Sequence, residues 1–179
     1  MTILICPGMH DPQLTQQFLH SLHPLRSHQW LIFPAQNYPA YSSIDLLSFL
    51  RKHLGAPAHA SPLLFIGFSA GVVGAMGAAA VWQMQLGKVR GLIALDGWGV
   101  PLLGNFPIHR VSHDAFTHWS SALLGAGQES FYAEPAVEHL ELWRSPDKTS
   151  GWWLKAPGCR VRCCAAEFLT VLFQKYQEL

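Results

Sequence analysis

Residues 63–82 have the sequence LLFIGFSAGVVGAMGAAAVW and contain no charged side chain. A run of about 20 apolar residues is long enough to cross a bilayer. It also suits a central parallel strand followed by a buried helix, because such strands are covered on both faces. Gly67 and Gly71 flank Ser69 as G-x-S-x-G, a motif that makes a sharp strand-to-helix turn. We therefore expect a strand that ends near Gly67, a turn at Ser69 and a helix over residues 72–85, and no membrane span.

Composition limits the partners that this chain can have. Half of its 179 residues are hydrophobic, 13% are charged, and the formal net charge is +1. Nucleic acid is not an expected partner, because binding to phosphates requires clustered Lys and Arg side chains. The length is that of one domain with one sizeable core, so we expect residues 1–179 to form a single domain.

The N-terminus and the cysteines favour a cytoplasmic protein. The first residues, MTILICPGMHD, lack the basic region and the long apolar run of a signal peptide. Cys6 falls in an expected strand, and Cys163 and Cys164 are adjacent and fall at the start of an expected final helix. Neither arrangement, nor the spacing to Cys159, resembles a disulfide framework or a zinc knuckle.

The apolar runs along the chain alternate between strand and helix patterns. Asp11 and Pro12 fit the start of a helix, and Ser43 is a candidate cap for another. A last amphipathic helix is expected over residues 166–179. Strands separated by helices predict an α/β fold, a three-layer αβα sandwich around a mostly parallel six-stranded sheet. The expected strands cover residues 2–6, 29–34, 62–67, 89–97, 106–113 and 137–144.

The elbow and the order of elements resemble the α/β-hydrolase superfamily, particularly its small members without a large lid. The resemblance implies that Ser69 is the nucleophile and that the backbone N–H of Ala70 forms half of an oxyanion hole. The segment Cys-Pro-Gly-Met-His at residues 6–10 resembles the loop that supplies the other half, with Met9 as the donor. Each such donor lowers the barrier by about 3 kcal/mol.

The base is harder to assign than the nucleophile. The family normally carries its acid after the next-to-last strand and its histidine after the last one. No histidine follows the strand expected at residues 137–144, and His139 is expected to enter that strand at its far end, away from the site. The usual triad therefore cannot be drawn from these elements.

Histidines gather instead around the expected strand at residues 106–113. His113 would stand at its carboxyl end, and Asp96 ends the strand that neighbours the elbow strand. We therefore predict a triad of Ser69, His113 and Asp96, in which the base takes the hydroxyl proton and the acid orients the base.

Three alternates stay open. His118 lies about one helical turn past Asp114, and Asp114 occupies the family's usual acid position. His10 lies in the oxyanion loop and is a further candidate base. Structural roles also remain possible: Asp96 with Gly97 also suits a strand-ending turn, and His113 with Asp114 also suits a helix cap.

We expect neither a cofactor nor a metal ion. His109, His113, His118 and Asp114 are potential metal ligands, but their spacings lack the i, i+4 histidine pair of helical zinc hydrolases. His109 is expected to be structural.

The connection after Asp96 is apolar and would cover the site, which favours an acyl chain or an aromatic ester as the substrate, unless these residues are ordinary core. We expect a small serine hydrolase that cleaves a carboxylic ester or thioester through an acyl-enzyme. The alternative is an inactive relative that uses the same fold to bind a ligand or a protein partner. The covering residues are Trp98, Val100, Pro101, Leu102, Leu103 and Phe106, with Trp119, Trp152 and Trp153 expected nearby.

Overall fold

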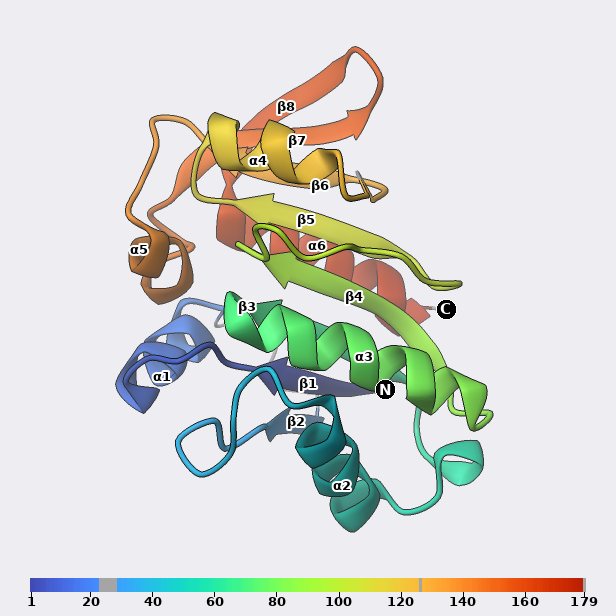
Figure 1. The fold of residues 1–179 in the computed structure, drawn as a ribbon. Helices are drawn as coiled ribbons and strands as arrows, with labels where there is room; N and C mark the ends of the chain where they lie inside the picture. Colours follow the sequence, from blue (N-terminus) through green and yellow to red (C-terminus); the bar gives the residue numbers. More distant parts are fainter. Residues whose placement is uncertain (23–28, 126, 179) are drawn as a thin grey trace.

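The computed structural model describes residues 1–22, 29–125 and 127–178, and one eight-stranded sheet runs through them (Figure 1). The strand order is β2-β1-β3-β4-β5-β6-β7-β8. The pairings from β2 to β6 are parallel, and β7 and β8 complete the sheet as antiparallel strands. The strands are β1 (Thr2–Cys6), β2 (Gln29–Ile32), β3 (Leu63–Phe68), β4 (Val89–Leu95), β5 (Ile108–Ser112), β6 (Ser130–Ala133), β7 (Ser150–Ala156) and β8 (Cys159–Cys164).

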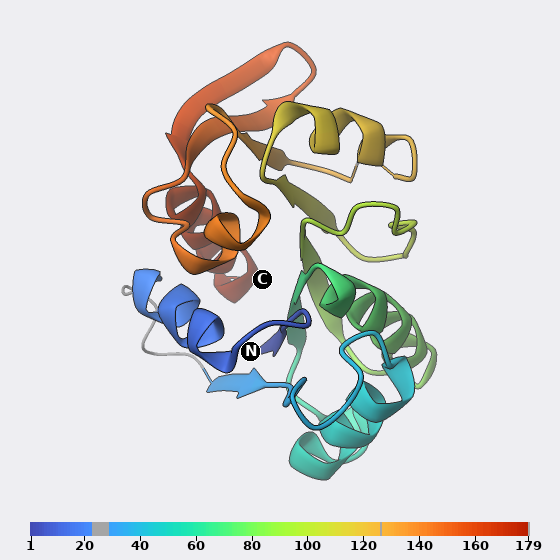
Figure 2. The ribbon, with the colours of Figure 1, turned by 60° about the vertical axis from the view of Figure 1, so that its left-hand side comes forward.

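Six α-helices within the described residues cover the two faces of this sheet. Figure 2 shows α1, α5 and α6 on one side and α2, α3 and α4 on the other. The helices are α1 (Pro12–Ser21), α2 (Ser43–Leu54), α3 (Ala70–Met84), α4 (Ala115–Ala122), α5 (His139–Arg144) and α6 (Ala165–Glu178); a short 3-10 helix, η2, spans Pro57–His59.

The core is split between the two faces of the sheet. In β1, Ile3 and Ile5 pack with the cluster under α1, α5 and α6, whereas Leu4 and Cys6 pack with the cluster under α2 and α3. Alternate residues of a strand point to opposite faces, so a strand between two helical layers must be apolar at every position. This explains the continuous apolar runs in the sequence.

Most of the expected elements are confirmed. Five expected strands correspond to β1–β5, and the apolar stretch divides at Ser69 into β3 and α3. Within the described residues, none of the helices combines the length and the hydropathy needed to cross a membrane. Helix α2 is capped by Ser42, whose side chain accepts from the Asp45 N–H, and not by Ser43.

The sixth strand was predicted in the wrong place. Residues 137–144 mostly form helix α5, because Leu142 and Trp143 are both buried and pack toward α1. Trp143 stacks on Phe18 at a centroid distance of 3.8 Å. The last parallel strand is β6, and the sheet has eight strands because the β7–β8 hairpin extends it. Cys163 and Cys164 therefore belong to β8 and not to the final helix.

Candidate active site

Ser69 stands at the turn between β3 and α3 with a backbone conformation that serine rarely adopts. Its φ is 52° and its ψ is −123°. Its own N–H is held by the Leu95 carbonyl at 2.9 Å, which ties the turn to the neighbouring strand β4. A non-glycine residue with positive φ costs about 1–3 kcal/mol and persists only where its surroundings enforce it. The division of the apolar stretch at Ser69 is therefore a strained strand-to-helix turn, and the nucleophile role of Ser69 stays a prediction.

Three glycines let the backbone pack tightly around this turn. A Cβ on Gly71 would lie 2.1 Å from the Cys6 carbonyl oxygen, and one on Gly67 would lie 2.9 Å from the Val72 Cα. A Cβ on Gly8 would come 3.1 Å from the Ser69 Cβ. The loop after β1 therefore lies directly against the turn at Ser69, and its role as an oxyanion loop stays a prediction.

Two backbone N–H groups near Ser69 make no hydrogen bond to the rest of the described chain. They belong to Ala70, the first residue of α3, and to Met9, whose side chain is 75% exposed. The first N–H groups of a helix have no partner within it, and the helix dipole places positive potential there. Both predicted oxyanion donors are thus free, although their roles remain a prediction.

Asp96 accepts hydrogen bonds from both neighbouring histidines. Its Oδ1 accepts from the His113 backbone N–H at 2.9 Å. Its Oδ2 lies 2.9 Å from Nδ1 of His113 and 2.8 Å from Nδ1 of His139. Burial alone would raise the pKa of Asp96, which is 5% exposed, but the hydrogen bonds from His113 and His139 outweigh burial and hold its pKa below the usual value. Asp96 is therefore a buried carboxylate.

His113 contacts Asp96 as expected, but its second nitrogen does not face Ser69. Nε2 lies 3.1 Å from Oδ2 of Asp114. The hydrogen bond with Asp96 raises the pKa of His113, against the effect of burial, and the charge of Asp114 adds to the rise. An imidazole between two carboxylates is favoured as the imidazolium, which donates from both nitrogens. In this arrangement it has no lone pair for a serine proton.

His139 lies in the site, contrary to the expectation that it would lie away from it. As the first residue of α5 it follows β6 closely, and its ring stacks on Phe68 at 4.7 Å. Phe68 in turn stacks on Trp143, so an aromatic column fixes the ring. Because Nδ1 donates to Asp96, the neutral ring carries its lone pair on Nε2, for which no hydrogen bond occurs within the described residues.

A cavity of about 470 Å³ joins these groups. Its walls include Trp98 and Phe116, which are 66% and 76% exposed. Of the connection expected to cover the site, Leu102 and Phe106 are instead buried in the core. The Ser69 hydroxyl makes no hydrogen bond within the described part of the chain. The lining residues are Ser69, Ala70, Val73, Asp96, Trp98, Val100, His113, Phe116, Thr117 and His139.

The alternates lie in other environments. Asp114 caps α4 by accepting from the Thr117 N–H at 2.5 Å. His10 packs its edge on Phe68, donates from Nδ1 to the Asp11 carbonyl at 3.0 Å, and has its pKa lowered mainly by burial. Its Nε2 is buried without a partner, and His10 is not among the residues that line the Ser69 cavity.

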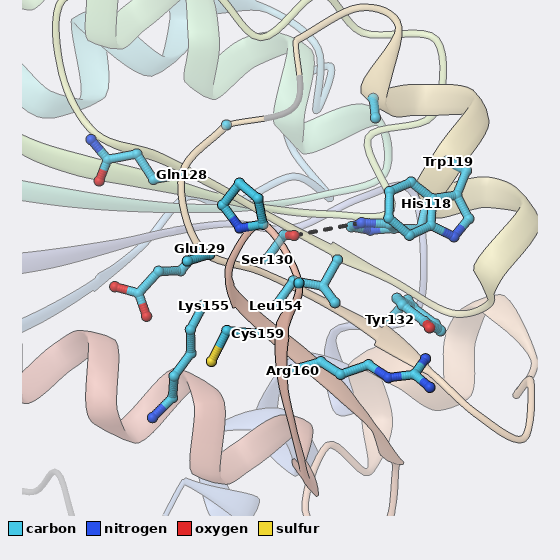
Figure 3. A pocket seen from close by; sticks show the side chains of 15 residues that line it. His118, Trp119, Gln128, Glu129, Ser130, Tyr132, Leu154, Lys155, Cys159 and Arg160 are labelled. Carbon is cyan, nitrogen blue, oxygen red and sulfur yellow. Dashed lines mark hydrogen bonds between the residues drawn. The ribbon is translucent and has the colours of Figure 1, made fainter.

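His118 lines a different, larger cavity of about 790 Å³ beside the β7–β8 hairpin (Figure 3). Its Nε2 is 3.5 Å from the Ser130 hydroxyl, the contact drawn as a dashed line in Figure 3. Burial, with help from the charge of Arg110, lowers the pKa of His118 to about 4. His109 bonds to the Glu129 carbonyl and the Tyr176 hydroxyl, as its expected structural role requires.

One group of three potential metal ligands occurs among the described residues. It consists of Asp96, His113 and His139, whose donor atoms all lie within 4.8 Å of one another. This group shares only His113 with the set of His109, His113, His118 and Asp114, whose spacing had argued against a metal site.

The position of His139 was predicted wrongly because the last parallel strand was assigned to residues 137–144. Two signals point to the correct assignment. Residues 130–133, SFYA, contain two aromatic residues before a proline, and Pro157-Gly158 separates two short runs rich in β-forming residues, which is a hairpin pattern. With the hairpin assigned, the last parallel strand moves to residues 130–133 and His139 follows it.

Comparison with protein-family models gave no match to this chain, and comparison with curated proteins gave none either.

Proposed function

We propose that this protein is a small serine hydrolase with a minimal α/β-hydrolase domain, which cleaves a carboxylic ester or thioester through an acyl-enzyme. One observation supports this proposal above the others. His139, whose Nδ1 is 2.8 Å from the buried Asp96, lines the same cavity as Ser69 at its strained turn. A nucleophile, a base and an orienting acid thus share one cavity.

In this proposal the base is His139 and not His113. Among the residues that the structure describes, Nε2 of His139 has no hydrogen-bond partner, whereas Nε2 of His113 faces Asp114. His139 also follows the last parallel strand, β6, which is where the α/β-hydrolase family carries its histidine. The acid differs from the family's usual choice, because His139 bonds to Asp96 after β4 and not to Asp114 after β5.

Acylation begins when the Ser69 oxygen attacks the acyl carbon of the substrate. As the new C–O bond forms, Nε2 of His139 accepts the hydroxyl proton, and Asp96 stabilises the resulting imidazolium. The negative charge moves to the carbonyl oxygen, where the free N–H groups of Ala70 and Met9 would receive it. The bond to the alcohol or thiol then breaks, and that leaving group takes the proton from His139.

Deacylation repeats these steps with water. His139 removes a proton from a water molecule that attacks the acyl carbon of the ester on Ser69. The tetrahedral intermediate collapses, the proton returns to the serine oxygen, and a carboxylic acid leaves. The enzyme is then unchanged, and one ester and one water have given one acid and one alcohol or thiol.

His113 and Asp114 act through Asp96 in this proposal. The His113 backbone N–H and Nδ1 both bond to the Asp96 carboxylate, which fixes its plane so that Oδ2 faces His139. Asp114 holds the other side of the His113 ring. Both are positioning residues, since neither needs to touch the reacting atoms.

The walls of the cavity favour an apolar acyl group. Val73, Trp98, Val100 and Phe116 surround Ser69, and none of them carries a charge. The volume of about 470 Å³ falls within the range of small-molecule sites and suits a medium-length acyl chain or an aromatic ring.

The absence of a hydrogen bond to the Ser69 hydroxyl in the described chain favours the alternative, an inactive relative that binds a ligand. A fluorophosphonate probe separates the two functions, because only an activated serine reacts quickly. We expect rapid labelling that Ser69→Ala abolishes while His53→Ala, a change on the exposed face of α2, does not. Wild-type labelling as slow as that of Ser69→Ala would favour the binding protein.

A further inference from the structure

We propose that Asp96, His113 and His139 bind a divalent transition-metal ion, with Zn²⁺ as the best fit, and that the bound ion blocks the catalytic site. The metal binding depends only on the geometry of the three side chains. The inhibition rests on the proposed hydrolase function.

The donor atoms are nearly at the separations that a zinc ion requires. Oδ2 of Asp96 is 2.9 Å from Nδ1 of His113 and 2.8 Å from Nδ1 of His139, and the three atoms lie within 4.8 Å of one another. Ligands about 2.0–2.1 Å from a tetrahedral zinc ion lie roughly 3.3 Å apart. The two distances to Oδ2 of Asp96 must therefore lengthen by only about half an ångström when the ion replaces the shared protons, and the two histidine nitrogens, which lie within 4.8 Å of each other, must come to about the same spacing.

The surrounding contacts hold the ligands in place before an ion arrives. The His113 backbone N–H bonds to Oδ1 of Asp96 and leaves Oδ2 for the metal. Oδ2 of Asp114 lies 3.1 Å from Nε2 of His113, the position where a metal-bound histidine usually has a carboxylate or carbonyl partner. The ring of His139 is held by its stacking on Phe68. Ordering these groups on binding therefore costs little entropy.

The ligand types select the metal. Two imidazoles and one carboxylate suit Zn²⁺, Co²⁺ and their neighbours and are poor ligands for Ca²⁺ and Mg²⁺, which prefer oxygen. Three protein ligands leave the fourth position of a tetrahedral ion for water on the cavity side.

Metal binding would remove the base from the proposed reaction. A neutral imidazole that binds a metal through Nδ1 carries its proton on Nε2. His139 would then have no lone pair for the Ser69 proton, and Asp96 would no longer orient it. The ion would compete directly with catalysis, without any movement of the fold.

Zinc binding should be measured on the full chain, after treatment with a chelator, by competition with a chromophoric zinc indicator. We expect saturable binding of one ion per chain. His139→Gln and His113→Gln should each weaken binding at least about 10-fold, because each removes a ligand. Ser69→Ala and the surface change His53→Ala should bind as the wild type does. Circular dichroism checks that each variant is folded.

A bound Co²⁺ ion distinguishes this site from the cysteines, because thiolate ligands add a charge-transfer band that imidazole and carboxylate lack. Cys163 and Cys164, which are adjacent in β8, are the pair of thiols that could bind the ion instead. A thiolate band, or binding lost in Cys163→Ser and kept in His139→Gln, would overturn the proposal. So would the absence of saturable zinc binding.

The last measurement tests inhibition. Hydrolysis of a p-nitrophenyl ester should fall as Zn²⁺ is added, with the concentration dependence of the binding curve, and a chelator should restore it. Full hydrolysis by the zinc-saturated protein would refute the inhibition. If the protein hydrolyses no ester, the proposed function fails, whereas the binding curves still decide whether the metal site exists.

Discussion

Two alanine variants, His139→Ala and His113→Ala, distinguish the roles of the two histidines that contact Asp96. In the proposed mechanism His139 takes the proton of Ser69, and His113 only holds the carboxylate. The two changes remove side chains of equal size from the same cavity wall, and urea denaturation of each variant measures the loss of packing, which includes the stack on Phe68 only for His139.

The structure sets the expected size of each effect. Removal of a general base costs roughly 10²- to 10⁴-fold in kcat/KM, or about 3 to 5 kcal/mol of transition-state stabilisation. His113→Ala removes one hydrogen bond to Asp96 but keeps the backbone N–H bond at 2.9 Å and the bond from His139. We expect that change to cost about 10-fold, close to 1.4 kcal/mol.

Steady-state hydrolysis of a p-nitrophenyl ester and the rate of fluorophosphonate labelling would both measure these losses. His113→Asn, whose amide nitrogen can replace Nδ1 as a donor to Asp96, should recover most of the activity that His113→Ala loses. His139→Ala combined with Ser69→Ala should be no worse than either change alone, because such residues act as a unit. An equal or greater loss in His113→Ala than in His139→Ala would refute the assignment of the base.

Three further predictions concern stability and reactivity. Gly71→Ala should lower the free energy of unfolding by about 3 kcal/mol or more, measured by urea denaturation, because its Cβ would lie 2.1 Å from the Cys6 carbonyl oxygen. Burial and the charge of Arg110 lower the pKa of His118 to about 4, so between about pH 4 and 6.5 the unfolded chain binds more protons than the folded chain. The free energy of unfolding should therefore fall by up to about 3 kcal/mol as the pH falls through that window. His118→Gln should lose this part of the pH dependence, and an unchanged dependence would contradict the prediction. A thiol reagent added to the native protein should modify the exposed Cys159 and leave Cys6 unmodified until unfolding, because burial raises the pKa of the Cys6 thiol and excludes the reagent.

Local patterns were enough to predict the first part of the fold. The strands up to β5 are apolar runs bounded by clear turn or helix signals, and the G-x-S-x-G pattern specified the division at Ser69. The contact between His113 and Asp96 followed from the rule that the carboxyl ends of parallel strands meet at one edge of the sheet.

The same reasoning failed where the periodicity was ambiguous. Leu140 and Leu142 alternate as in a strand, but Leu140 is 43% exposed and the buried pair is Leu142 and Trp143. Only the packing of α5 against α1, a tertiary contact between segments over 100 residues apart, decides for a helix. The hairpin signal at Pro157-Gly158 would have moved His139 to the end of the last parallel strand, but its contact with Asp96 depends on the packing of α5 and could not be read from a local pattern.

Ser69 and Asp96 share a strained backbone conformation at the ends of neighbouring strands. Both have positive φ, at 52° and 50°, in positions where glycine would avoid the strain. Leu86 also has positive φ, but it follows the end of α3, where left-handed residues commonly terminate helices. The free energy of unfolding, measured by urea denaturation, should therefore be about 1 kcal/mol higher for Ser69→Gly than for Ser69→Ala, although neither variant has a hydroxyl. The hydrogen bonds to Asp96 offset its strain, whereas the Ser69 hydroxyl has none within the described residues, so a chain shaped for stability alone would favour glycine at the end of β3.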